Sequence, residues 1–214
     1  MTYHYVAASI EGFVQQLAVA YVQHGYWFYV TGVIPEGKDV AAVDRKLMER
    51  YGIAMSKWAR ARRKAQGLAN VHYLRHGHTF VLLATKGRHE FWQREANVIR
   101  DIRRVPIVFA GYSIGYRKGA DRKWHVSVRI HPSEYNKLKS YFLDLATRRA
   151  VEPLLREFAS IRFEPYAAIR RQLFNILRAV NRTRKTAGYE RIPTTAIRLN
   201  RRPVKVFVTE AARL

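Results

Sequence analysis

The feature that most constrains the fold is a dense apolar run at Phe80–Ala84. The run shows no alternation of apolar and polar residues, and Lys86-Gly87 follows shortly after its end. A strand with one solvated face alternates, whereas a strand buried on both faces stays apolar throughout. We therefore predict a central strand over residues 79–85, in a sheet that is covered on both sides.

Strands and helices are predicted on both sides of this run. The aromatic and β-branched segment Tyr26–Ile34 favours a strand, and Val71–Arg75 favours another. Asp39 is placed to cap a helix that ends near Tyr51. Further helices are predicted over residues 8–24, 56–66 and 90–103.

The second half of the chain contains a predicted hairpin and then helices. Residues 105–117 and 123–130 form its arms, because Trp124, Val126, Val128 and Ile130 alternate with polar residues. Helical periodicity follows Pro132. The predicted helices cover residues 133–149, 152–158 and 165–185, and a basic tail at 189–214 adds a short strand at 204–208.

The order of these elements from Tyr26 to about Ile114 is strand, helix, strand, strand, helix, strand. This is the ferredoxin-like βαββαβ plan of α+β proteins. We expect that core to carry an N-terminal helix, a long hairpin and basic C-terminal helices. The predicted domains are a core over residues 1–150 and a basic helical extension over 151–214.

Charge points to the class of partner. The 214 residues include 39 Lys and Arg but only 16 Asp and Glu, a formal net charge of +23. Such an excess repels itself unless a polyanion neutralises it, and nucleic acid is the commonest such partner. No apolar run approaches the roughly 18 residues that a membrane-spanning helix needs. We expect a cytoplasmic protein with no membrane partner.

The charge is unevenly distributed. Residues 161–214 hold thirteen basic and three acidic residues, whereas residues 1–40 hold one basic and three acidic residues. The C-terminal quarter is therefore the predicted grip on a polyanion. The weakly charged N-terminal helix is a candidate interface for a protein partner. Because the chain has no cysteine, a cysteine-ligated zinc finger is excluded.

Clusters of cations are the candidate phosphate contacts. They recur at helical spacing on two predicted helices, flank the hairpin turn and continue into the tail. A solvated helix face is the alternative for any one helix. The candidates are Lys57, Arg60, Arg63 and Lys64; Arg117, Lys118, Arg122 and Lys123; Arg170, Arg171, Arg178, Arg182, Arg184 and Lys185; and Arg198, Arg201 and Arg202.

Aromatic residues on the hairpin lie among these cations. Tyr112, Tyr116 and Trp124 could stack on unpaired bases while the neighbouring cations hold the backbone. Alternatively, these rings belong to the hydrophobic core. Nothing in the sequence distinguishes DNA from RNA as the partner, and binding alone needs no cofactor.

A histidine pair, His76-Gly77-His78, opens the apolar strand. Two histidines at i and i+2 on a strand point to the same side and can share a metal ion. The alternative is a basic turn at a strand end. General acid–base cleavage of RNA by His76 or His89 is a further possibility.

The histidine pair on a ferredoxin-like sheet resembles the single-tyrosine HUH transposases and endonucleases. That resemblance implies a divalent metal (Mg or Mn) at His76 and His78, and Tyr141 on a later helix as the nucleophile. Gly77 departs from the bulky apolar residue usual in that family. Leu145 stands where a polar ligand is expected, so Asp144 would have to replace it.

Three functions therefore remain open. The first is a nucleic-acid-binding accessory factor of a mobile element, a reverse transcriptase or a defence system. The second is a metal-dependent tyrosine endonuclease or transposase of the HUH type. The third is a ribosome-associated RNA-binding protein.

Overall fold

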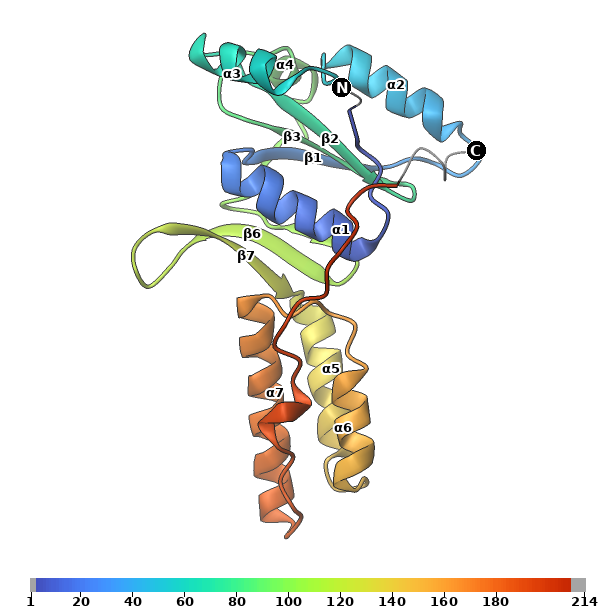
Figure 1. The fold of residues 1–214 in the computed structure, drawn as a ribbon, viewed down its shortest axis with the longest axis vertical. Coiled ribbons are helices and arrows are strands. Elements are labelled where there is room, and N and C mark those ends of the chain that lie inside the picture. The colour runs from blue at the N-terminus through green and yellow to red at the C-terminus, as the bar shows by residue number, and fades with distance from the viewer. Residues whose placement is uncertain (1–2, 209–214) are drawn as a thin grey trace. The chain divides into compact units, whose positions relative to one another are not determined.

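The computed structural model describes residues 3–208, which belong to two compact units (Figure 1). The sheet unit comprises Met1–Ile107, Ile114–Val126 and Val204–Leu214, and the helical unit comprises Val108–Ser113 and Ser127–Pro203. The expected mixed α+β class is confirmed. In the described part of the chain, no helix has both the length and the apolarity needed to cross a membrane.

The sheet unit is built on a four-stranded sheet with the order β2-β3-β1-β4. Each neighbouring pair is antiparallel, so β1 and β2 run parallel with β3 between them. The strands are β1 (Phe28–Val33), β2 (Val71–His76), β3 (Thr79–Ala84) and β4 (Arg100–Asp101).

The central position predicted for the apolar run is confirmed. In β3, Val81–Ala84 are completely or almost completely buried, and β1 and β2 lie on its two sides. The β1–β3 register pairs Phe28 with Ala84 and Val33 with Thr79. This register places the apolar half of each strand opposite its partner's.

Helices α2 (Val40–Arg50), α3 (Lys57–Ala65) and α4 (Phe91–Arg94) lie together over one face of this sheet (Figure 1). Asp39 caps α2, because its carboxylate accepts the N–H groups of Ala41 and Ala42, as predicted. The hydrophobic core beneath them joins side chains from strands, helices and loops. It contains Val30, Tyr51, Ile53, Val71, Tyr73, Leu82, Ala84 and Phe91.

The helix predicted over residues 90–103 is wrong in length, since α4 ends at Arg94. The backbone beyond it joins the sheet: the Ile102 N–H donates to the Trp27 carbonyl at 2.8 Å. The Asp101 carboxylate accepts the Arg103 N–H at 2.9 Å and closes a turn there. Pairing with β1 and this local turn outweigh the helical propensity of the segment.

The predicted N-terminal helix covers the opposite face of the sheet (Figure 1). It consists of α1 (Ile10–Gln15), a π-helical stretch (Gln16–Tyr21) and a 3₁₀ turn (Val22–His24) that ends at Gly25. Its apolar side chains, including Phe13 and Leu17, are buried. Its apolar face is thus occupied within the chain, and protein binding by this helix stays a prediction.

The two ends of the described chain lie side by side next to β2. The Ala7 N–H donates to the Arg75 carbonyl at 2.8 Å, and the Ala8 N–H donates to the Val206 carbonyl at 2.9 Å. The strand predicted at 204–208 is reduced to an isolated bridge between Ala7 and Phe207.

The hairpin is present, but its first arm is divided. Strands β5 (Ile107–Phe109), β6 (Tyr112–Lys118) and β7 (Trp124–Ile130) form a separate sheet in that order. The backbone reverses between β5 and β6 at Ala110 and Gly111, where φ is 46° and 81°. The division between the two units falls within β5, β6 and β7.

Three helices make up most of the helical unit. They are α5 (Pro132–Leu145), α6 (Val151–Ala159) and α7 (Ala167–Thr186), and a 3₁₀ turn (Thr194–Ala196) follows. The rings of Phe142 on α5 and Phe158 on α6 stack with their centroids 4.0 Å apart. The predicted boundary at residue 150 therefore needs correction, because α5 groups with the later helices rather than with the sheet.

Candidate nucleic-acid interface

The turn between β6 and β7 presents a concentrated positive charge. Arg117, Lys118, Arg122 and Lys123 are all exposed. Asp121, the one acidic residue of the turn, is paired with His125 at 2.8 Å and accepts the Lys123 N–H at 3.1 Å. Among the described residues, none of the four cations forms an ion pair with a carboxylate. We call these four residues the hairpin cations.

Beside the hairpin cations lies a stack of three aromatic rings. The Trp27 and Tyr116 ring centroids are 5.4 Å apart at 26°, and those of Tyr116 and Trp124 are 5.7 Å apart at 16°. Trp124, at one end of this aromatic ladder, is 46% exposed. Near-parallel rings with an exposed end provide a surface on which a planar base can stack.

The other end of the aromatic ladder is held in place by Arg103. Its guanidinium lies 4.8 Å from the centroid of the Trp27 ring and binds the Asp101 carboxylate in bidentate fashion. Partial burial disfavours ionisation of Asp101, but the hydrogen bonds from Arg103 outweigh it and lower the pKa of that carboxyl. Trp27 and Arg103 were not among the predicted site residues. The aromatic run at Tyr26–Tyr29 was the available signal for Trp27.

Tyr112 is not part of the aromatic ladder, so its predicted stacking role is wrong. The side chain is 2% exposed, and its hydroxyl accepts the Glu164 N–H at 2.9 Å. Its ring meets Phe163 edge-on at 5.0 Å. Burial at the first residue of β6 makes Tyr112 a core residue of the helical unit. Trp124 is exposed, whereas Tyr116 is half-buried between the Trp27 and Trp124 rings, and base stacking by these two residues stays a prediction.

The basic face predicted on α3 is divided between two sides of the helix. Arg60 donates to the backbone carbonyls of Val71 and Ile53, and Arg63 donates to that of Ala69 at 3.0 Å. Both arginines therefore satisfy backbone carbonyls within the sheet unit, and the prediction that they line an outer phosphate-binding face is wrong. Lys57 and Lys64 are exposed, as expected.

The exposed side of α3 also carries an aromatic and a basic residue that do not belong to the aromatic ladder. Trp58 is 80% exposed, and Arg62, one turn later, is exposed beside it. Trp58 and Arg62 are four residues apart and share one side of the helix. Arg60 lies two residues, about 200°, from Trp58, and this offset was the available signal that separates the two sides.

In the helical unit, α7 presents a continuous line of charge. Arg171, Arg178, Arg182 and Lys185 are exposed, and α7 contains no acidic residue. At 100° per residue the four positions fall within one narrow stripe about 21 Å long. The stripe lies opposite the buried side, which includes Ile169, Leu173, Ile176 and Val180. We call these four cations the α7 stripe.

Two arginines predicted for this surface point elsewhere. Arg184 is 1% exposed and donates to the carbonyls of Ala146 and Arg149 at 2.7 and 2.8 Å, and also to that of Glu190. Arg170 is half-buried and donates to the carbonyls of Pro165 and Leu199. The predicted phosphate contact by Arg184 is therefore wrong, because the helical unit uses its guanidinium internally.

The tail residues differ in how accessible their charge is. Arg198 is paired at 2.6 Å with Glu164, whose side chain is buried, so its charge is compensated locally. The Arg201 guanidinium lies 4.8 Å from the centroid of the Tyr166 ring, and its side chain is exposed. Arg202 is also exposed. Of the three, Arg201 and Arg202 remain candidate phosphate contacts.

The histidine pair does not occupy two positions of one strand, and that prediction is wrong. His76 is the last residue of β2, and Gly77, with φ of 55°, places His78 in the turn before β3. The Nδ1 atoms of His76 and His78 lie within hydrogen-bonding distance of the Ala7 and Ile34 carbonyls, respectively. Residues 3–208 contain no group of three or more His, Cys, Asp or Glu side chains arranged to hold a metal.

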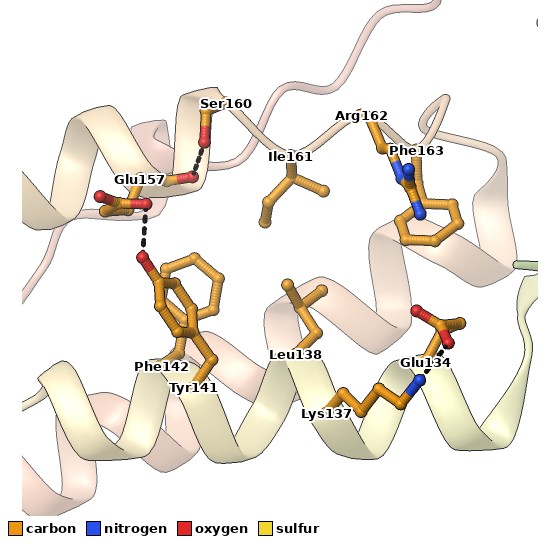
Figure 2. A pocket seen from close by; sticks show the side chains of 10 residues that line it. All are labelled: Glu134, Lys137, Leu138, Tyr141, Phe142, Glu157, Ser160, Ile161, Arg162 and Phe163. Atoms are coloured by element: carbon orange, nitrogen blue, oxygen red, sulfur yellow. Dashed lines mark hydrogen bonds and ion pairs between the residues drawn. The ribbon is translucent and has the colours of Figure 1, made fainter.

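Tyr141 lies in the helical unit, on the exposed side of α5 (Figure 2). Its hydroxyl donates to Glu157 Oε2 at 2.9 Å, and this hydrogen bond raises the pKa of the phenol. His76 and His78 belong to the other unit. Asp144, the expected substitute metal ligand, pairs with Arg148 at 2.8 Å.

Comparisons with protein-family models, with curated proteins and with solved structures found no significant match to this chain.

Proposed function

We propose that this protein binds nucleic acid, with the aromatic ladder stacking on unpaired bases while nearby cations hold the phosphates. The observation that carries this proposal is the position of the ladder beside four exposed cations that pair with no carboxylate in residues 3–208. Stacking accepts any base, because every base has a π-face, and the cations supply affinity for the backbone.

The sheet face is a poor candidate for the same role. Modules that read RNA on a four-stranded sheet need that face open, so that aromatic residues can stack on bases. Here the N-terminal helix covers one face, and α2, α3 and α4 cover the other. The proposal therefore assigns base contact to the hairpin, although the strand order supports a ferredoxin-like plan with β3 inserted between parallel β1 and β2.

The α7 stripe is assigned to phosphates alone. Its cations lie on one side of a straight helix, so they can follow a nucleic-acid backbone without reading bases. We further propose that the protein acts as an accessory factor, delivering or protecting nucleic acid for another enzyme. The hairpin cations, the α7 stripe and the aromatic ladder are suited to holding a single strand of nucleic acid.

Tryptophan fluorescence tests the proposal directly, because two of the three ladder residues are tryptophans. We expect a single-stranded oligonucleotide to quench the emission, and Trp124→Ala to weaken binding by about 5- to 150-fold, since one stacked base contributes about 1–3 kcal/mol. Trp58→Ala removes an exposed tryptophan outside the ladder and is the matched control. Equal affinities of the Trp124→Ala and parent proteins would remove the ladder from the interface.

One observation favours a second function, the tyrosine endonuclease. Glu157 Oε2 accepts a hydrogen bond from the Tyr141 hydroxyl at 2.9 Å, so a carboxylate is in place to remove the phenol proton during an attack, although the same bond keeps the resting phenol protonated. This function predicts a covalent protein–DNA adduct that requires Mg²⁺ or Mn²⁺, persists through denaturation and disappears in Tyr141→Phe. Intact DNA with no adduct in either metal would leave the binding function alone.

A further inference from the structure

The helical unit contains a pocket of about 330 Å³ between α5 and the end of α6 (Figure 2). Its middle is apolar: Leu138 and Ile161 face one another across it, and the Phe142 and Phe163 rings complete the wall. This volume lies at the small end of the range for ligand sites, about 300–1,000 Å³. A single planar ring system with a short substituent matches it better than a larger ligand.

The two ends of the pocket are polar and differ in charge. At one end Glu157 accepts the Tyr141 hydroxyl, and its carboxylate has further lone pairs to offer a ligand. At the other end Arg162 is exposed and its guanidinium lies 5.7 Å from the centroid of the Phe163 ring. Across the pocket from it, Lys137 is paired with Glu134 at 2.9 Å. The complementary ligand carries hydrogen-bond donors at one end, a flat apolar body and an anion at the other.

We infer that this pocket binds a guanine nucleotide, with the base between Leu138 and Ile161 and its edge on Glu157. Guanine presents two adjacent donors, N1–H and the N2 amino group, and a carboxylate presents two adjacent acceptors. Adenine and cytosine would each turn a ring-nitrogen acceptor toward the carboxylate. The phosphate would then lie toward Arg162.

The guanine could come from a free nucleotide or from an unpaired nucleotide in a strand. In the second case the inference rests on the proposed function, because an extruded base must come from bound nucleic acid. In the first case it is independent of the aromatic ladder, which belongs to the sheet unit. Guanosine monophosphate and a short oligonucleotide with one central guanine are therefore the two probes.

Isothermal titration of the full chain with guanosine, inosine and adenosine monophosphates is the test. We expect guanosine monophosphate to bind about tenfold or more tightly than inosine monophosphate, which lacks the N2 amino group and leaves one carboxylate acceptor unpaired. Absence of guanosine monophosphate binding, or equal affinity for the three nucleotides, would overturn the inference. If guanosine monophosphate does not bind while strands still bind without any guanine preference, the pocket assignment fails and the proposed function stands.

Two variants separate recognition from folding. Glu157→Gln preserves the shape of the side chain but presents one acceptor and one donor. The affinity for guanosine monophosphate should therefore fall about tenfold or more, while the preference shifts toward adenosine monophosphate. Glu152→Gln makes the same charge change on the same helix outside the pocket and should bind normally. Ile161→Trp should block the pocket without changing its charge. Unchanged guanosine monophosphate affinity in Glu157→Gln or in Ile161→Trp would contradict the assignment.

Discussion

At the scale of single residues, arginine serves two opposite purposes in this chain. Arg184 lies inside the helical unit and holds three carbonyls, whereas Arg182, two positions earlier, belongs to the exposed α7 stripe. Counting cations cannot separate them. Periodicity could have done so, because Leu173, Leu177, Val180 and Arg184 follow a spacing of four, three and four on the buried side.

Replacing Arg184 should therefore affect stability rather than binding. Arg184→Met keeps a long side chain but leaves the Ala146, Arg149 and Glu190 carbonyls without their donor, so the free energy of unfolding should fall by about 3 kcal/mol. Chemical denaturation measures the change. Arg182→Met should change stability by less than about 0.5 kcal/mol while weakening nucleic-acid binding. A reversal of these two effects would contradict the assigned positions.

Gly87 is required by its surroundings as well as by its backbone. Its φ is 138°, and a Cβ added there would lie 2.5 Å from the Ala69 amide nitrogen. Gly87→Ala should lower the free energy of unfolding by more than about 2 kcal/mol, because both the strain and the backbone clash must be relieved. Gly37→Ala, where φ is 81° but nothing lies within 4 Å, isolates the strain and should cost about 1 kcal/mol. If thermal or chemical unfolding shows equal losses of unfolding free energy in Gly87→Ala and Gly37→Ala, the clash does not contribute.

His72 should make the sheet unit sensitive to acid. It lies against the rings of Tyr21 and Tyr26 at 4.3 and 4.7 Å, and burial, assisted by the Arg60 charge, lowers its pKa well below 6.5. The unfolded chain therefore takes up a proton first as pH falls. Stability is complete above about pH 6.5 and declines below it, toward the folded-state pKa. His72→Gln should flatten this decline in unfolding free energy between pH 7 and 5, and an unchanged decline would exclude His72 as its cause.

At the scale of elements, long periodic segments were predictable and tertiary pairing was not. The predicted helix at 165–185 closely matches α7, because its apolar stripe and its basic face have the same period. The predicted helix at 90–103 contains only the single turn of α4, because Arg100 and Asp101 pair with β1. A single sequence does not report which backbone segment will complete the edge of a sheet.

The aromatic ladder shows the same limit. Tyr116 and Trp124 lie on the two arms of a predictable hairpin, so their proximity could be anticipated. Alternation alone places Trp124 on the side of the buried Val128 and Ile130 and does not predict its exposure. Trp27, which lies just before β1, contacts Tyr116 across a long sequence separation, and hydrophobic periodicity does not predict such a contact. The position of Tyr112 on the same strand suggested the same role, yet burial in the other unit removes it.

The α7 stripe should control part of the salt dependence of binding. Arg178→Gln with Arg182→Gln removes two phosphate contacts, so a plot of log affinity against log salt should become shallower by about 1.4 for single strands. Arg45→Gln with Lys46→Gln makes the same charge change on exposed positions of α2 and is the control. If both double variants reduce the slope equally, net charge and not the stripe sets the salt dependence.

At the scale of the whole molecule, the net charge of +23 is unevenly available to a partner. Arg75 and Arg198 pair with the buried carboxylates of Asp44 and Glu164, and several other arginines are bound to backbone carbonyls. The hairpin turn and α7 each present four exposed cations, and further exposed cations lie on α2, on α3 and in the loops. Composition therefore supports the proposed class of partner, and the three-dimensional structure separates the cations whose charge is compensated within the chain from those that are exposed.

The measurement that tests the central claim most directly is single-strand affinity as a function of salt, with and without the hairpin cations. In the variant Arg117→Gln, Lys118→Gln, Arg122→Gln and Lys123→Gln, the ladder remains while its phosphate contacts are lost. We predict weaker binding and a slope shallower by about 0.7 for each contact removed, up to about 2.8. Affinity and slope identical to those of the parent protein would contradict the claim that this hairpin is where nucleic acid binds.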